Sequence, residues 1–163
     1  MPAYWIDANV LMESANGAYG FDLAPGFWEF MDEQIENKAF CVPQEVVIEI
    51  STRDTDLKEW MDDRPDTFVA EATREIQEKY QEIADHVSNG GYEVHEKRKF
   101  LNGADGWLIA HAKIAGGKVV TQEVRTGSGA RAVKIPNVCD VFDTPVINRD
   151  DLLREFAVRL VRE

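Results

Sequence analysis

The amino-acid sequence predicts a single α/β domain over residues 1–163, with a three-layer α/β/α arrangement around a short, mostly parallel, five-stranded sheet. Three observations lead to this fold class. Short apolar segments alternate with longer amphipathic ones, which is the order of elements in α/β proteins. Apolar residues make up 44% of the chain and charged residues 29%, which is a globular balance. A chain of 163 residues corresponds to one ordinary domain with one sizeable core.

The first part of the chain contains one expected strand and two expected helices. Residues 3–7 are apolar or small up to a final acid, which is typical of a short buried strand. A helix is expected at residues 9–14, and the Gly-rich segment 16–25 is expected to be a loop. The proline at its end suits the start of a helix over residues 26–37, where apolar residues recur at helical spacing.

The middle of the chain repeats this alternation. Residues 39–42 form a second apolar strand, and Pro43 then suits the first position of a helix. Residues 62–66 are polar and contain a proline, so we expect a break there. Apolar residues recur every three or four positions over residues 67–87, which predicts one long amphipathic helix ended by Asn-Gly-Gly at 89–91.

The last part of the chain is expected to supply three strands and two helices. The strands are expected at residues 92–95, 118–121 and 132–135. One helix is expected over residues 102–115, and the other runs from Arg149 to about Arg162. Because strands alternate with helices, the sheet should be mostly parallel with helices on both faces.

Charge and apolar content restrict the classes of function. The 30 acidic and 18 basic residues give a net charge of −12, so a fold-wide basic face for nucleic acid is not expected, although local basic patches are. No segment approaches the roughly 20 apolar residues that span a bilayer. A signal peptide is not expected either, and Cys41 and Cys139 are expected to be buried free thiols. These features favour a cytoplasmic protein without membrane contacts.

Acidic and hydroxyl side chains follow two of the expected strands. In parallel sheets ligands bind beyond the carboxyl ends of the strands, which is where Asp7, Thr121 and Glu123 should lie. If the first and fourth strands are neighbours, Asp7 and Glu123 face one crevice, and Thr121 would bond a backbone group or a metal-bound water. The alternatives are a helix-capping role for Asp7 and a solvated loop position for Glu123.

Two helices carry further acidic candidates. Asp105 is aligned with the apolar residues of its helix, so it should point inward and need a partner there. The alternative is a capping pair with Asn102, which has the required spacing. Glu45 and Glu49 lie one turn apart after Pro43, and helical spacing alone does not decide which of them approaches the crevice.

Acids gathered from separate segments point to a cation site. Carboxylates repel one another unless a positive charge joins them, and their hard oxygens suit Mg²⁺ or Mn²⁺. The sequence offers no Ser–His or Cys–His nucleophile arrangement and no Gly-rich phosphate loop. Residues 124–131, which include Thr-Gly-Ser-Gly, lack the lysine of such a loop and are expected to be a flexible connection.

These residues bring a known family into view. The chain resembles the PIN domains, a nuclease fold that includes the VapC-type toxins of prokaryotic toxin–antitoxin pairs. Four short pieces carry the resemblance, in the family's order and over about three quarters of the chain: Ile6–Leu11, Val42–Ile50, Ala104–Ala110 and Val119–Glu123. In addition, Phe21–Trp28 looks like an uncharacterised prokaryotic PIN-like subfamily.

The resemblance implies a metal-dependent ribonuclease. It assigns catalytic and metal-binding roles to Asp7, Glu49, Asp105 and Glu123, with Asp7 and Asp105 as direct ligands, and it favours Glu49 over Glu45. Asn9 either orients a ligand or caps a helix. The chain departs from the family's pattern at two positions, which should alter its affinity for metal. Ala8 stands where the family often has a hydroxyl residue, and Glu123 stands where it often has Asp. The family also implies a cognate antitoxin that masks the site with a basic side chain, and homodimers.

An acidic ribonuclease still has to hold RNA phosphates. The candidate phosphate contacts among the basic residues of the later segments are Lys97, Arg98, Lys99, Arg125, Arg131 and Lys134. The alternative is that these basic residues are ordinary solvent-exposed side chains. Trp28 and Trp107 are expected in the core or at an interface rather than as platforms for RNA bases.

Rival functions are a phosphatase and a binding module. A haloacid-dehalogenase-like, Mg²⁺-dependent phosphatase also has an Asp at a strand end, but it needs a second acid where this chain has Asn9. A receiver-like phospho-accepting domain needs paired early acids and a late strand-end lysine that the chain lacks. A catalytically inactive PIN-like binding module is the non-enzymatic alternative, with Ala8 and Glu123 as its signs.

Overall fold

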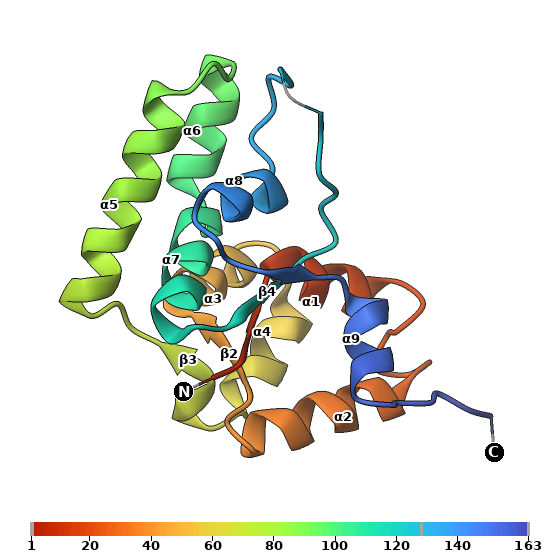
Figure 1. The fold of residues 1–163 in the computed structure, drawn as a ribbon. Coiled ribbons are helices and arrows are strands. Elements are labelled where there is room, and N and C mark those ends of the chain that lie inside the picture. Colours follow the sequence, from red (N-terminus) through yellow and green to blue (C-terminus); the bar gives the residue numbers. More distant parts are fainter. Residues whose placement is uncertain (1, 128, 163) are drawn as a thin grey trace.

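A single parallel sheet lies at the centre of the protein (Figure 1). The computed structural model describes residues 2–127 and 129–162. Within them, five short strands form a sheet of order β3-β2-β1-β4-β5, in which every neighbouring pair is parallel. The strands are β1 (Tyr4–Ile6), β2 (Phe40–Pro43), β3 (Val69–Ala70), β4 (Lys118–Val120) and β5 (Val146–Ile147).

Helices cover both faces of the sheet, which confirms the three-layer α/β/α prediction (Figure 1). One face carries α1 (Ala8–Asn16), α2 (Pro25–Glu36), α3 (Gln44–Ser51), α4 (Thr55–Asp62) and α9 (Arg149–Glu155). The other face carries α5 (Arg74–Asn89), α6 (Val94–Asn102), α7 (Asp105–Ala115) and α8 (Ile135–Val141). None of the helices in the described ranges is long and apolar enough to cross a bilayer.

The alternation of side chains along the strands produces the two cores. Trp5 and Val119 pack into the layer of α5–α8, whereas Ile6 and Val120 pack into the layer of α1–α4 and α9. Successive residues of a strand point to opposite faces, so even these strands of two to four residues contribute to both cores. Both cysteines are buried and free, as expected.

Capping residues define several of the helix ends. Asp54, Thr73 and Asn148 each accept a hydrogen bond from the backbone N–H of the third residue beyond them, at 3.1, 3.3 and 2.8 Å. Pro25 occupies the first position of α2, where its missing N–H is not needed. Gly116 ends α7 with φ +70°, a conformation that glycine adopts without strain.

Two of the five predicted strands were wrong. Residues 92–95 are not a strand, because Glu93 is extended only as the residue before α6. Residues 132–135 are not paired in the sheet either, since Ile135 and Pro136 already begin α8. The fifth strand is instead Val146–Ile147, and Val69–Ala70 is the third. Strands of two residues are too short to show a period in the sequence.

Three predicted helices were also wrong in their bounds. Residues 66–70 form a 3₁₀ turn (Asp66–Phe68) and β3, so the helix predicted at 67–87 begins only after Thr73. The helix predicted at 102–115 starts at Asp105, and Asn102 ends α6. The last helix ends at Glu155 rather than near Arg162, and α4 was not predicted.

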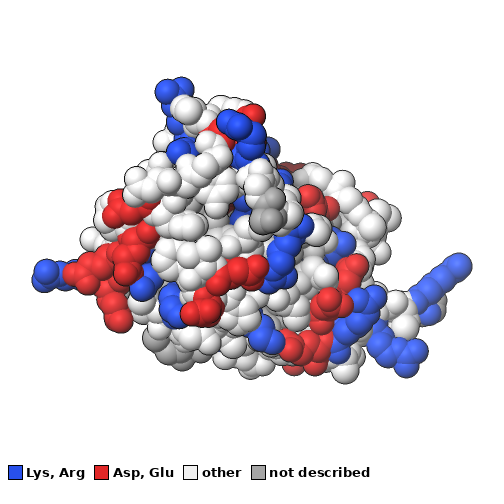
Figure 2. All heavy atoms as spheres, turned by 45° about the horizontal axis from the view of Figure 1, so that its top comes forward, with Lys and Arg blue, Asp and Glu red and all other residues white. Residues whose placement is uncertain are grey.

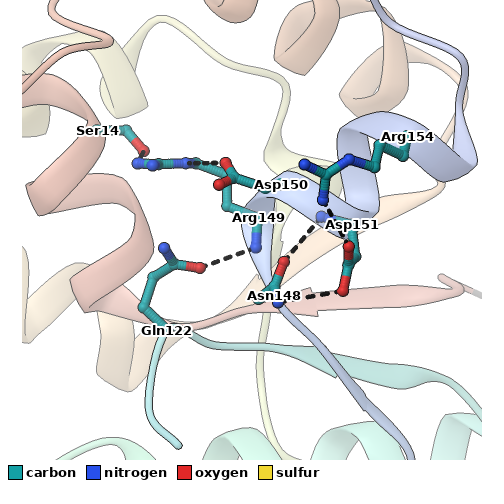
Figure 3. Close-up of polar contacts among 7 residues, drawn as sticks. All are labelled: Ser14, Gln122, Asn148, Arg149, Asp150, Asp151 and Arg154. Atoms are coloured by element: carbon teal, nitrogen blue, oxygen red, sulfur yellow. Dashed lines mark hydrogen bonds and ion pairs between the residues drawn. The ribbon is translucent and has the colours of Figure 1, made fainter.

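A polar network attaches α9 to the rest of the molecule (Figure 3). The Arg149 guanidinium donates a hydrogen bond to the Ser14 hydroxyl of α1 at 3.1 Å and lies 4.2 Å from the centre of the Tyr19 ring. The Arg149 backbone N–H donates to the Gln122 side-chain oxygen at 2.9 Å, just beyond β4. These contacts tie the last helix to β4 and α1 beside the carboxyl edge of the sheet.

We expect Arg149→Ala to lower the free energy of unfolding by about 2 kcal/mol, because a charged hydrogen bond and a cation–π contact are lost together. Urea unfolding followed by circular dichroism measures the change. Arg154→Ala is the control, since its side chain is 74% exposed against 18% for Arg149 and should cost about 0.5 kcal/mol or less. Equal losses in the two variants would contradict the anchoring role.

Candidate functional site

The sheet changes its direction of winding between β1 and β4. From β1 the chain proceeds to β2 and β3 on one side, whereas β4 leads to β5 on the other. Ligands of open α/β sheets bind at the carboxyl edge of such a switch point. Asp7 lies there, and its backbone N–H extends the pairing of the two strands by donating to the Val120 carbonyl at 2.9 Å.

The Asp7 carboxylate is held by both of its oxygens. It is 3% exposed, with Oδ1 accepting from the Asn9 backbone N–H at 3.3 Å and Oδ2 accepting from the Thr121 hydroxyl at 2.9 Å. The Thr121 Oγ in turn accepts from the Glu123 backbone N–H at 3.1 Å. Asp7 therefore caps α1, which confirms the capping alternative, and it also contacts Thr121, which follows β4.

Burial and neighbouring charges act strongly on two of the acids. Burial, reinforced by the charges of Glu123 and Glu49, raises the pKa of Asp7 to about 7, against the stabilising hydrogen bond from Thr121. Burial also raises the pKa of Asp105 well above its usual value, and Asp7, Glu123 and Glu49 add to the effect. The fold therefore brings the predicted acids close enough to influence one another.

An open cleft of about 810 Å³ lies over this group. Glu49 of α3, Asp105 at the start of α7 and Glu123 beyond β4 all line it, together with Asn9 of α1. Asp105 reaches the carboxyl edge because α7 precedes β4 and runs antiparallel to it. Ala104, not Asn102, is the residue before this helix, so the alternative capping pair of Asn102 and Asp105 is wrong.

The comparisons with known proteins can be set beside this geometry. The model of a family described as a domain of unknown function, DUF4411, matches residues 4–160. The chain belongs to the DUF4411 family. The matched range contains every candidate site residue, and a comparison with curated proteins found no match. The function of this DUF4411 protein is therefore argued from its site.

Helix α3 presents two glutamates to the cleft in different surroundings. The charge of Glu49 raises the pKa of Asp7 and Asp105, and its carboxylate lies 3.7 Å from the Arg53 guanidinium. Glu45 lies one turn earlier, and its charge adds to the raised pKa of Tyr80. Burial raises the pKa of Glu45 itself. Helical spacing left the choice between the two glutamates open, and the charge interactions associate Glu49 with the acidic group of the DUF4411 site.

The predicted phosphate contacts are scattered, and one of them lines this cleft. That residue is Lys99, whose charge opposes the rise in the pKa of Asp105. Arg125 pairs with Asp140 at 2.8 Å and lines a neighbouring hollow of about 460 Å³ that also includes Glu123. On the face that Figure 2 shows, basic and acidic side chains are interspersed.

The other predicted contacts have different positions. Lys97 donates to the Ser88 carbonyl at 2.9 Å, and Arg131 pairs with Glu93 at 3.7 Å. Arg98 is exposed on α6, and Lys134 precedes α8.

Sequence reasoning missed Arg53, which also lines the cleft and whose only signal was its i,i+4 spacing from Glu49.

The donor set fits a hard divalent cation, although it is not closed around one. Over residues 2–127 and 129–162, no three acidic, histidine or cysteine side chains converge as a complete set of metal ligands. Glu49 is paired with Arg53, and a Glu123 oxygen accepts from the Ile135 backbone N–H at 3.1 Å. Burial raises the pKa of Asp7 and Asp105 most, and repulsion by the neighbouring acids adds to it. A cation would favour the charged carboxylates against both effects, while Glu49 and Glu123 exchange their present partners.

We expect Asp7→Asn to stabilise the metal-free protein at pH 8 by about 2–4 kcal/mol. Burial raises the pKa of Asp7 from its ordinary 3.8 to about 7, so the folded state holds an extra proton between these two pH values. The wild type should therefore lose stability as the pH rises through this window, and the loss should persist above it. Urea unfolding in EDTA from pH 4 to 8 measures the difference.

The matched control is Asp56→Asn, an exposed carboxylate in the first turn of α4 outside the cleft, which should change the free energy of unfolding by about 1 kcal/mol or less and should not stabilise the protein at pH 8. If Asp7→Asn were less stable than the wild type at pH 8, the carboxylate would be stabilising the fold, contrary to the electrostatic argument.

Proposed function

We propose that this DUF4411 protein is a divalent-metal-dependent endoribonuclease that hydrolyses RNA phosphodiester bonds in the acidic cleft. The observation that supports the proposal most directly is that carboxylates from four separate segments interact at the switch point of the sheet. Glu49, Asp105 and Glu123 line the cleft, and their charges act on the pKa of Asp7 or are acted on by it. Two of them, the buried Asp7 and the half-buried Asp105, have raised pKa values, which are typical of functional sites. The resemblance to PIN domains supports the same chemistry.

The residues of the site would have different roles in this reaction. Asp7 and Asp105 would hold Mg²⁺ or Mn²⁺ directly, and Glu49 and Glu123 would complete the ligands. A bound divalent ion lowers the pKa of a coordinated water and offsets negative charge that develops on the phosphate. Thr121 fixes the Asp7 carboxylate by its hydrogen bond at 2.9 Å, so that ligand is oriented before any ion arrives.

Asn9 and Lys99 have supporting roles in the proposal. The Asn9 backbone N–H donates to the Asp7 carboxylate, which caps α1, so the expectation that Asn9 itself caps a helix is wrong. Asn9 also lines the cleft, where its side chain would face the substrate. Lys99 supplies a positive charge at the same cleft, where an RNA phosphate would approach. Arg53 would be released to the substrate when Glu49 turns to the ion.

A phosphatase that uses Asp7 as nucleophile is less compatible with the site. Both Asp7 oxygens accept hydrogen bonds, the side chain is 3% exposed, and it is absent from the described lining of the cleft. A nucleophile has to reach the phosphorus atom in line with the leaving group. The binding-module alternative predicts neither metal binding nor cleavage, so the same experiment tests it.

The biological setting that we propose is the toxin component of a toxin–antitoxin pair. An antitoxin with a basic side chain would find Glu49, Asp105 and Glu123 in the open cleft and would block RNA from them. Buried free thiols and an RNA substrate favour a cytoplasmic location. A homodimer remains part of the proposal on the family resemblance.

We expect Mn²⁺ to bind the wild type with an affinity at least tenfold higher than that for Asp105→Asn, because one direct ligand is removed. We also expect Mn²⁺-dependent cleavage of single-stranded RNA to fall at least about 100-fold in this variant. Isothermal titration calorimetry and gel assays of labelled RNA provide the two measurements.

Asp56→Asn is the matched control, since it makes the same chemical change on an exposed position of α4. Unchanged cleavage in Asp105→Asn would point to a contaminating nuclease and would oppose the proposal. Absence of both Mn²⁺ binding and cleavage in the wild type would favour the binding module.

We expect Lys99→Ala to raise the KM for RNA about three- to tenfold with a smaller change in kcat, and to lower the salt dependence of kcat/KM by about 0.7 in log–log slope. Lys97→Ala is the matched control on the same helix, because its ammonium donates to the Ser88 carbonyl and does not line the cleft. Initial rates of RNA cleavage from 50 to 200 mM KCl measure KM, kcat and the salt dependence of kcat/KM. Equal effects of the two substitutions would mean that the contact is not local to the cleft.

A further inference from the structure

One part of the cleft is formed by an aromatic pair rather than by the acidic group. The rings of Tyr80 and Trp107 stack with centroids 3.9 Å apart and planes 3° from parallel. Trp107 lines the cleft, and both residues are only partly buried. The Tyr80 hydroxyl donates to the Leu101 carbonyl at 3.2 Å, which fixes the pair against the end of α6.

The backbone is adapted to this stacking. Gly106 precedes Trp107 on α7, and a Cβ at that position would lie 2.8 Å from the Tyr80 ring. The lack of a side chain lets the Tyr80 ring lie directly against α7 and support the indole. A rigid, supported indole on a cleft wall is a suitable platform for a flat apolar ligand.

A carboxylate beside this platform has an unused hydrogen-bonding atom. Glu45 lines the cleft, and its Oε2 is buried without a hydrogen-bond partner among the described residues. Its charge acts on Tyr80, so it lies near the aromatic pair. A buried polar atom without a partner is costly in a folded protein. Glu45 is only half-buried, so its side chain can turn into the cleft, where a ligand that donates hydrogen bonds would remove that cost.

We propose that Trp107 and Glu45 form a nucleobase subsite that selects guanine in single-stranded RNA, an extension that rests on the ribonuclease function proposed above. Stacking on Trp107 would accept any base. Selection would come from Glu45, since the two oxygens of a carboxylate match the adjacent N1–H and N2–H donors of guanine. Adenine and cytosine present an amino group beside an acceptor nitrogen, which a carboxylate repels.

The position of the subsite suits the proposed reaction. Glu45 and Glu49 lie one turn apart on α3, and Asp105 and Trp107 lie two residues apart on α7. All four residues line the same cleft, so a base held on Trp107 brings its own phosphate toward the acidic group. The subsite therefore determines where along an RNA strand the proposed cleavage takes place.

The test uses nucleotides without metal, so that no cleavage intervenes. The full chain, labelled with ¹⁵N, is titrated with the 5′-monophosphates of guanosine, inosine, adenosine and cytidine in EDTA at pH 8. The Trp107 indole N–H signal is assigned from its absence in Trp107→Leu. We expect GMP to shift this signal and to bind at least fivefold more tightly than AMP or CMP, with IMP, which lacks the N2 amino group, in between.

Two variants separate selection from stacking. Glu45→Gln should bring GMP binding to within twofold of AMP, while Glu29→Gln, an exposed glutamate on α2 outside the cleft, should keep the preference. Trp107→Leu should weaken binding of all four nucleotides. Equal binding of the nucleotides by the wild type, absence of a Trp107 shift, or an unchanged GMP preference in Glu45→Gln would each overturn the subsite.

Failure of the subsite and failure of the nuclease proposal are distinguishable. Metal-dependent RNA cleavage without a GMP preference would overturn the subsite and leave the ribonuclease. A GMP preference that is lost in Glu45→Gln, without cleavage by the wild type in Mn²⁺, would support the subsite and overturn the nuclease.

Discussion

The burial of the Asp7 carboxylate between β1 and β4 is the constraint on which the rest of the site depends. A carboxylate that is 3% exposed has lost most of its hydration, and hydrogen bonds from Thr121 and Asn9 replace only part of it. The sheet pairing fixes this position, since Ile6 and Val120 are register partners immediately before it. The acid is therefore held in place by the same strands that form the core.

The surrounding acids increase the electrostatic cost of a charged Asp7 instead of reducing it. Glu123 and Glu49 raise the pKa of Asp7 further, and Asp7 does the same to Asp105. A fold selected for stability alone would place a neutral group at this position. The retained repulsion is understandable if a cation joins these carboxylates in the working protein, because the ion turns like-charge repulsion into shared attraction.

The sequence allowed parts of this picture to be predicted for definite physical reasons. Asp7, Thr121 and Glu123 follow strands with several apolar residues, and the strand-end rule then brings them to one edge. The two-residue strands β3 and β5 gave no period, so they were missed, and segments next to Pro136 and Glu93 were mistaken for strands. The choice between Glu45 and Glu49 depends on how α3 leans across the sheet, which spacing along one helix does not contain.

Helix α3 gives the cleft two chemically different halves. The charge of Glu49 acts on Asp7 and Asp105 and pairs with Arg53, whereas the charge of Glu45, one turn away, acts on Tyr80 of the aromatic pair. Glu45 and Glu49 thus have different neighbours because they lie one turn apart on the same helix. The nucleotide proposed above as a ligand would use both halves, with its base on the aromatic pair and its phosphate held at the acidic half through a divalent cation.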